Sequence, residues 1–121
     1  MPVSVRIDVA RRRVEVVASG LLTGEEMLAA QGEIARSPGF DPGFDALFDL
    51  AAVSSVQMSA VKVRIVSDNT VFAPGIRRAF VTSNDAAYGL MRMLGALLDE
   101  RGGEIEMFQD RAAAERWLDR R

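Results

Sequence analysis

Segments with the two-residue hydrophobic period of a β-strand alternate along this chain with segments that have the period of a helix. Valine or isoleucine occupies every second position from 3 to 9, and Val14, Val16 and Ala18 repeat the pattern after three consecutive arginines. Such alternation is typical of strands with one buried face, so the first eighteen residues predict a hairpin. A chain of this kind folds most simply into a sheet with helices packed on it.

The later elements are predicted from local start and stop signals. Thr23 and Glu26 have capping-box spacing at the start of a helix that Ser37-Pro38-Gly39 ends. Further strands are predicted at 46–50, 79–82 and 104–108, and the last helix begins at its cap, Asp110. The stripes expected to face the sheet are Met27, Leu28, Gln31, Ile34 and Ala35 in the first helix, Ala87, Leu90, Met91, Leu94, Leu97 and Leu98 in the third, and Ala113, Ala114, Trp117 and Leu118 in the last.

Residues 59–72 fit two structures. Their apolar residues alternate as in a strand, yet they match a helical face nearly as well. We favour a helix, because a parallel strand after 46–50 requires a crossover connection. The resulting order, β-β-α-β-α-β-α-β-α, predicts an α/β fold with one mixed sheet, in which 46–50 is a central strand and 104–108 an edge strand. We expect residues 1–121 to form a single domain.

Composition limits the chemistry that this chain can perform. The formal net charge is −2, so we do not expect nucleic acid as a partner. The sequence has no Cys and no His, which excludes thiolate nucleophiles, thiolate zinc sites and catalysis by a Ser-His-Asp triad. We expect no cofactor and no metal. With no run long enough to span a membrane and no signal-like start, a cytoplasmic location is expected.

Two groups of arginines carry alternative interpretations. Arg11-Arg12-Arg13 lies at the predicted hairpin tip, and Arg77-Arg78 precedes a predicted strand. Each group is either a solvated surface segment or an anion contact, and we favour the solvated surface in both cases.

Several short motifs resemble one family of small bacterial proteins. These motifs are Pro42-Gly43, Asp49-Leu50, the segment from Ala87 to Met93, and the tail formed by Phe108, Asp110, Ala114 and Trp117-Leu118. Together they resemble the STAS/SEC14-domain, or SpoIIAA-like, proteins. The resemblance implies a STAS-like fold and a regulatory or protein-binding role, and the SEC14 name implies a carrier of a small apolar ligand or lipid.

The STAS family's phosphorylation switch is not matched at its expected position. In phosphorylated members an Asp-Ser pair lies near the start of the helix after this strand, and alignment from Asp49-Leu50 places Gln57-Met58 there. Ser54, Ser55 and Ser59 flank the position, so a displaced phosphoacceptor is one interpretation. We favour the other, in which these serines cap the helix.

Candidate binding residues follow two of the predicted parallel strands. One group is Asp49, Ser54, Ser55 and Ser59, and the other is Thr82, Ser83, Asn84 and Asp85. Ligands in open α/β sheets bind at such strand ends. If the two loops are neighbours, Asp49 and Asp85 can hold a hydroxyl, an amine or Mg²⁺. We favour the simpler alternative, with Asp85 in a first helical turn and Asp49 bonded to nearby backbone.

Tyr88 is the remaining candidate. It shares a helix with Met91 and Met93 and can line an apolar pocket to which Phe72, Phe80 and Met58 contribute, although such a cluster is more often core.

Three functions remain open. The leading hypothesis is a non-catalytic protein-interaction module with an unidentified protein partner, and the second is a small apolar-ligand carrier with a closed pocket. The third is a hydrolase or lyase that uses Asp49 and Asp85. Pairing of an edge strand or of the hairpin across a two-fold axis would give a homodimer.

Overall fold

The computed structural model describes residues 3–83, 85–99 and 102–120, in which five strands and four helices follow the predicted order. The strands are β1 (Val3–Asp8), β2 (Arg13–Thr23), β3 (Asp45–Gln57), β4 (Arg77–Val81) and β5 (Glu104–Phe108), and the helices are α1 (Gly24–Arg36), α2 (Ala60–Asp68), α3 (Asp85–Asp99) and α4 (Arg111–Asp119). Asn84 and the side chains of Ala87, Leu90, Met91, Leu94 and Leu98 lie outside what the structure describes, so most of the predicted α3 stripe is not tested.

The five strands form one mixed sheet in the order β1-β2-β3-β4-β5. β1 pairs with β2 in antiparallel fashion, with Val5 opposite Val16, and the other three pairings are parallel. The predicted α/β class, the central position of the strand at 46–50 and the edge position of 104–108 are therefore confirmed.

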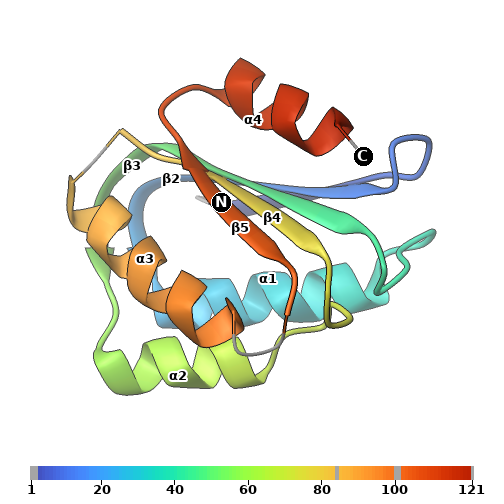
Figure 1. Ribbon diagram of the computed structural model, residues 1–121. Coiled ribbons are helices and arrows are strands. Elements are labelled where there is room, and N and C mark those ends of the chain that lie inside the picture. The colour runs from blue at the N-terminus through green and yellow to red at the C-terminus, as the bar shows by residue number, and fades with distance from the viewer. Residues whose placement is uncertain (1–2, 84, 100–101, 121) are drawn as a thin grey trace.

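The helices cover the two faces of the sheet unequally. α1, α2 and α3 lie against one face, and α4 lies alone on the other (Figure 1). β2 shows how the strand period places side chains on both faces. Val14, Val16 and Ala18 join the core beneath α1–α3, while Arg13 and Glu15 alternate with them and contact charged groups on α4.

Each face has its own apolar core. In the larger one, Phe48 and Phe80 on neighbouring strands stack with ring centroids 4.9 Å apart. The smaller one lies under α4, where Leu118 and Ala114 pack on Leu47, Ala79 and Val81. The parallel strands β3 and β4 thus bury side chains on both faces, as expected for strands covered on both sides.

The N-caps of α1 and α4 were predicted correctly. Thr23 Oγ1 accepts a hydrogen bond from the Glu26 backbone N–H at 3.2 Å, and the Glu26 carboxylate accepts one from the Thr23 N–H at 3.0 Å. Asp110 caps α4 by accepting from the Ala113 N–H at 2.8 Å. Residues 59–72 contain helix α2, as favoured.

The interpretation of the arginines as solvated surface was wrong for two of them. Arg13 is 3% exposed and Arg78 is 2% exposed. Arg13 begins β2 and pairs with Asp119 at 2.7 Å. Arg78 lies within β4, with its guanidinium 5.5 Å from the Phe72 ring centroid. Both turn inward because they occupy strand positions whose side chains are covered by other elements.

One smaller expectation also differs from the structure. In α1 it is Ala30, not Ala35, that is buried with Met27 and Ile34. None of the helices in the described ranges is both long and apolar enough to cross a membrane.

Candidate functional site

Four parallel strands end at one edge of the sheet, and a helix follows each of them. α1, α2, α3 and α4 begin after the carboxyl ends of β2, β3, β4 and β5. Ligands of open α/β sheets bind at this edge, where loops and helix N-termini meet. The predicted site residues lie along it, but in three separate groups.

The first group lines a cavity between the ends of β4 and β5, which we call the β4–β5 cavity. Its volume is about 240 Å³, and it is lined by Thr82, Ser83, Asp85, Tyr88, Met107, Phe108 and Gln109. The structure thus brings together four of the predicted binding residues, Thr82, Ser83, Asp85 and Tyr88. Asp85 lies in the first turn of α3, as favoured from the sequence.

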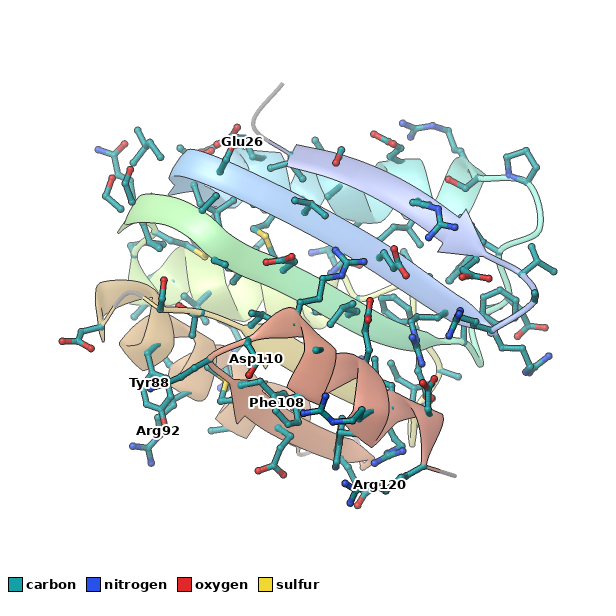
Figure 2. All side chains as sticks on the ribbon, turned by 90° about the horizontal axis from the view of Figure 1, so that it is seen from above. Glu26, Tyr88, Arg92, Phe108, Asp110 and Arg120 are labelled. Atoms are coloured by element: carbon teal, nitrogen blue, oxygen red, sulfur yellow. The ribbon has the colours of Figure 1, made fainter. Side chains whose placement is uncertain are left out.

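Two hydrogen bonds hold the strand ends at the β4–β5 cavity. The Thr82 N–H donates to the Phe108 carbonyl at 3.0 Å, which ties the two strand ends together, and Ser83 Oγ donates to the Ala51 carbonyl at 3.3 Å. The Tyr88 side chain is 44% exposed and lies near Phe108 in Figure 2.

The other apolar residues proposed for a Tyr88 pocket lie elsewhere. Phe72 and Phe80 belong to the larger core, and Met58 lines a different cavity. Phe80 alternates in β4 to the face covered by α1–α3, where it stacks on Phe48.

Asp49 has partners of its own on the face of the sheet that carries α4. Its Oδ1 accepts from the Ala51 N–H at 3.1 Å, and its Oδ2 lies 3.3 Å from Arg111 Nη1. The backbone bond agrees with the favoured interpretation. Because Asp49 is ion-paired to α4 and is not among the residues that line the β4–β5 cavity, the geometry offers no support for an Asp49–Asp85 cleft.

The serines divide between a strand and a helix cap. β3 extends to Gln57, so Ser54 and Ser55 are strand residues, and the prediction that they cap the next helix was wrong. Ser59 is the N-cap of α2 and accepts from the Lys62 N–H at 3.1 Å, as expected.

Ser59 lines a second cavity of about 270 Å³, together with Gly24, Glu25, Gln57, Met58 and Lys62. Lys62 Nζ lies 3.2 Å from the Glu25 carboxylate. The pKa of Glu25 lies below its ordinary value because its carboxylate accepts a backbone hydrogen bond and is close to the Lys62 ammonium. The Lys62 ammonium in this cavity is therefore already paired.

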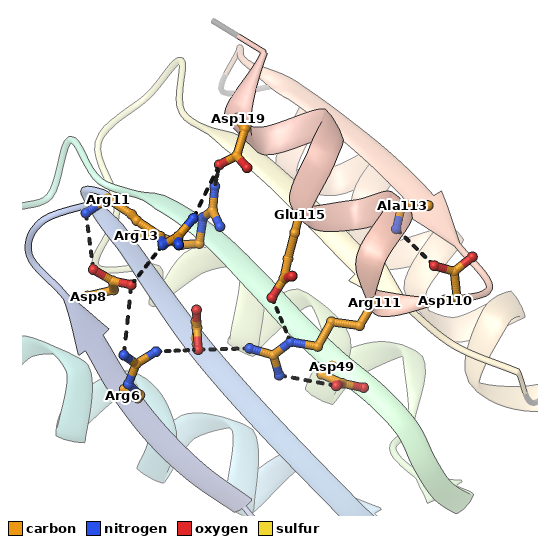
Figure 3. A network of polar contacts seen from close by, with 11 residues as sticks. Arg6, Asp8, Arg11, Arg13, Asp49, Asp110, Arg111, Ala113, Glu115 and Asp119 are labelled. Carbon is orange, nitrogen blue, oxygen red and sulfur yellow. Dashed lines mark hydrogen bonds and ion pairs between the residues drawn. The ribbon is translucent and has the colours of Figure 1, made fainter.

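A network of charges joins α4 to β2 and β3 (Figure 3). Arg111 contacts Glu15 at 2.8 Å, Asp49 at 3.3 Å and Glu115 at 3.0 Å. Arg6 on β1 reaches the same Glu15 at 2.9 Å. The guanidinium groups and carboxylates neutralise one another, so this network holds α4 in place and offers little free charge to a ligand.

Metal ligation finds no support in the described part of the chain, where no group of three or more carboxylates lies close enough together to hold an ion.

Comparison with known proteins gives a fold and no activity. No protein-family model matches the sequence, and neither does any curated protein. Among solved structures, an uncharacterized protein of the DUF3478 family from Shewanella loihica PV-4, described as having a SpoIIAA-like fold, matches with a TM-score of 0.60. The match has 20% sequence identity and covers 96% of this chain and 93% of that one. This chain has a SpoIIAA-like fold.

The SpoIIAA-like fold confirms the resemblance drawn from the sequence motifs, at the level of architecture. It also explains which site residues were missed. Met107, Phe108 and Gln109 line the β4–β5 cavity because β5 is the neighbour of β4 and ends at the same edge. The predicted strand at 104–108 pointed to these three residues, because it ends among them. No comparable signal linked Arg111 to Glu15, since the two residues are 96 positions apart.

Proposed function

We propose that this SpoIIAA-like chain is a non-catalytic protein-interaction module, and that it binds its partner through the exposed side of α2. We call this surface the α2 face and define it by Val61, Arg64 and Ile65. The observation that carries the proposal is the exposure of its two aliphatic side chains, 71% for Val61 and 37% for Ile65.

Among the described residues, neither Val61 nor Ile65 belongs to an apolar core. Val61 and Ile65 are one helical turn apart and therefore lie on the same side of α2. The opposite side already supplies the core with Val63 and Val66. β-Branched residues lower helix propensity, so they add nothing to the local stability of α2. A partner that covers the two side chains removes their apolar area from water, which favours binding.

The charges of the α2 face indicate the chemistry of the partner. Arg64 lies beside Val61 and Ile65 on the exposed side, whereas Lys62 is paired with Glu25. A partner segment with two or three apolar side chains and a flanking carboxylate complements this surface. An amphipathic helix laid along α2 has this arrangement.

The non-catalytic part of the proposal rests on the available side chains. The sequence has no His and no Cys. Asp49, one of the two carboxylates considered for acid–base work, is held by Arg111 and by backbone. Its carboxylate therefore serves the attachment of α4.

Affinity capture from lysate of the native organism tests the α2 face. The tagged chain is compared with its V61D/I65D variant, and bound proteins are quantified by mass spectrometry. Burial of each aliphatic side chain contributes about 1.5–3 kcal/mol, so we expect recovery of the specific partner to fall at least about tenfold.

Val9 provides the matched control. It is 56% exposed in the turn between β1 and β2, so V9D introduces the same side chain at a distant exposed valine. Capture that V9D preserves and V61D/I65D abolishes supports the proposal. Equal capture by all three proteins contradicts it.

The binding of a small apolar ligand is a second candidate, favoured by the place of Tyr88 in the β4–β5 cavity. Native mass spectrometry separates the two candidates. A bound mass that is lost on denaturation supports the carrier, and bare subunits support the interaction module. The same spectrum reports whether the chain forms a homodimer.

A further inference from the structure

The β4–β5 cavity has no basic side chain in its described lining, although the chain is rich in arginine. Its described lining residues carry one carboxylate, two aromatic rings, three hydroxyls, one amide and one thioether, and they include neither Lys nor Arg. Asp85 supplies the carboxylate, and Tyr88 and Phe108 supply the rings. The arginine nearest in sequence, Arg111, is engaged by Glu15, Asp49 and Glu115 instead.

The position of Asp85 excludes an anion as the best ligand. A helix N-terminus attracts negative charge, but in α3 the first turn already carries the Asp85 carboxylate. A second negative group would be repelled by it. A cation, in contrast, is attracted by this carboxylate.

The aromatic rings favour the same sign of charge. An ammonium group close to the face of an aromatic ring is attracted by the ring quadrupole. Tyr88 keeps 44% of its side chain exposed, and Phe108 is half-buried with its ring centroid 5.7 Å from that of Trp117. The lining therefore offers both an electrostatic and an apolar contact to a cation that carries a ring.

The acceptors favour a primary ammonium over a quaternary one. A primary ammonium has three N–H donors. Asp85, Ser83 and Gln109 each carry a side-chain oxygen and are among the residues that line the β4–β5 cavity. Ser83 Oγ uses its proton toward the Ala51 carbonyl, which leaves its lone pairs free to accept.

The size of the cavity limits the rest of the ligand. A cavity of about 150 Å³ holds benzene in an engineered protein, and sites for drug-sized ligands occupy about 300–1,000 Å³. At about 240 Å³, the β4–β5 cavity fits one ring with a short chain and is too small for a lipid.

We propose that the β4–β5 cavity binds a small arylalkyl primary amine, with its ammonium on Asp85 and its ring against Tyr88 and Phe108. The site is independent of the α2 face, which lies on another helix.

Three probes that share a phenyl ring but differ in charge test this assignment. The probes are 2-phenylethylamine, 2-phenylethanol and 3-phenylpropionate, each titrated into the ¹⁵N-labelled chain to about 10 mM, a range that detects even millimolar affinity. We expect saturable amide shifts with the amine at residues 82–88 and 107–109. The alcohol should bind at least about tenfold more weakly, and the carboxylate should not bind.

Two variants locate the charge contact. D85N keeps the side-chain shape and should weaken the amine at least about tenfold, while leaving the alcohol unchanged. E106Q removes the same charge from an exposed residue of β5 that does not line the cavity, and should bind the amine as the wild type does. Dispersed spectra of both variants would serve as the control that they are folded.

A last probe separates a free amine from a lysine side chain of a protein. Nα-acetyl-lysine amide has the same ammonium without the ring and should bind more weakly than 2-phenylethylamine. Failure of the amine to bind, equal binding of the amine, alcohol and carboxylate, tighter binding of the lysine probe, or unchanged binding in D85N would each overturn the proposal.

Discussion

Arg111 connects α4 to two strands of the sheet. It lies 2.8 Å from Glu15 on β2 and 3.3 Å from Asp49 on β3, and it also pairs with Glu115 one turn along its own helix. Burial lowers the pKa of Arg111, but its contacts with these carboxylates outweigh burial and raise the pKa above its ordinary value. The guanidinium therefore remains charged and links the helix to the sheet.

Replacement of Arg111 should destabilise the protein more than replacement of an exposed arginine on the same helix. In R111A the nearly buried Glu15 retains only exposed Arg6 as an ion-pair partner among the described contacts. We expect the free energy of unfolding, measured by urea denaturation, to fall by about 1–2 kcal/mol, a value reduced for the partial exposure of Arg111.

The matched control is R116A, at an exposed position of α4, with an expected loss below about 0.5 kcal/mol. Equal losses in R111A and R116A would mean that the network contributes nothing to the attachment of α4.

At the level of single residues, predictability depended on the distance along the chain. The capping contacts of Thr23 and Asp110 span three residues and were predicted from spacing alone. The burial of Arg13 depends on Asp119, 106 positions away, and no local pattern indicates it. The same holds for Asp49, whose backbone bond was expected and whose arginine partner was not.

Among the elements, β3 departs most from its prediction. A strand was expected at 46–50, where the residues are almost all apolar, but β3 continues to Gln57. Most residues from 51 to 57 are exposed, and the register with β2 shifts twice, between Val17 and Ser19 and between Gly20 and Leu21. These irregularities remove the period-two signal, so Ser54 and Ser55 were placed in a loop.

The connection from α3 to β5 requires a glycine at one position. Gly103 has a φ of 98°, and a Cβ there would collide with the Ile76 carbonyl oxygen. We expect G103A to lower the free energy of unfolding by at least about 2 kcal/mol, because neither the backbone conformation nor the backbone of Gly75 and Ile76 beside it tolerates a side chain.

Gly89 gives the opposite expectation for the same substitution. It is exposed within α3, and among the described residues no atom lies within 4 Å of the place that an added methyl group would take. G89A should raise stability by about 0.5–1 kcal/mol, since alanine favours a helix. Thermal and urea unfolding of both variants would refute the argument if the two changes had the same sign.

The architecture of the whole molecule was predictable because two independent signals agreed. Alternating periods gave the order of elements, and the crossover rule placed residues 59–72 in a helix and the strand at 46–50 within a parallel set. The position of α4 on the opposite face was not predictable, since an amphipathic helix after an edge strand can pack on either side. The structure shows this choice as a second, smaller core under α4 (Figure 1).

Two cores of unequal size should respond differently to the loss of the same side chain. Leu50 is buried in the larger core under α1–α3, and Leu118 is buried in the smaller core under α4. A leucine-to-alanine change costs about 2–5 kcal/mol, depending on how far the surroundings can collapse. We expect L50A near the upper end of this range and L118A near the lower end, because α4 can shift to fill its own cavity.

Amide hydrogen exchange measures whether the cores unfold together. L50A should accelerate exchange in every strand and helix of the described chain, because the larger core contributes to global stability. L118A should accelerate exchange in α4 and leave the most protected amides of β3 less affected, because α4 can open while the sheet and α1–α3 remain packed. If L118A instead accelerates exchange in β3 as strongly as in α4, the two faces form one cooperative unit, and α4 is as essential to the SpoIIAA-like fold as the helices opposite it.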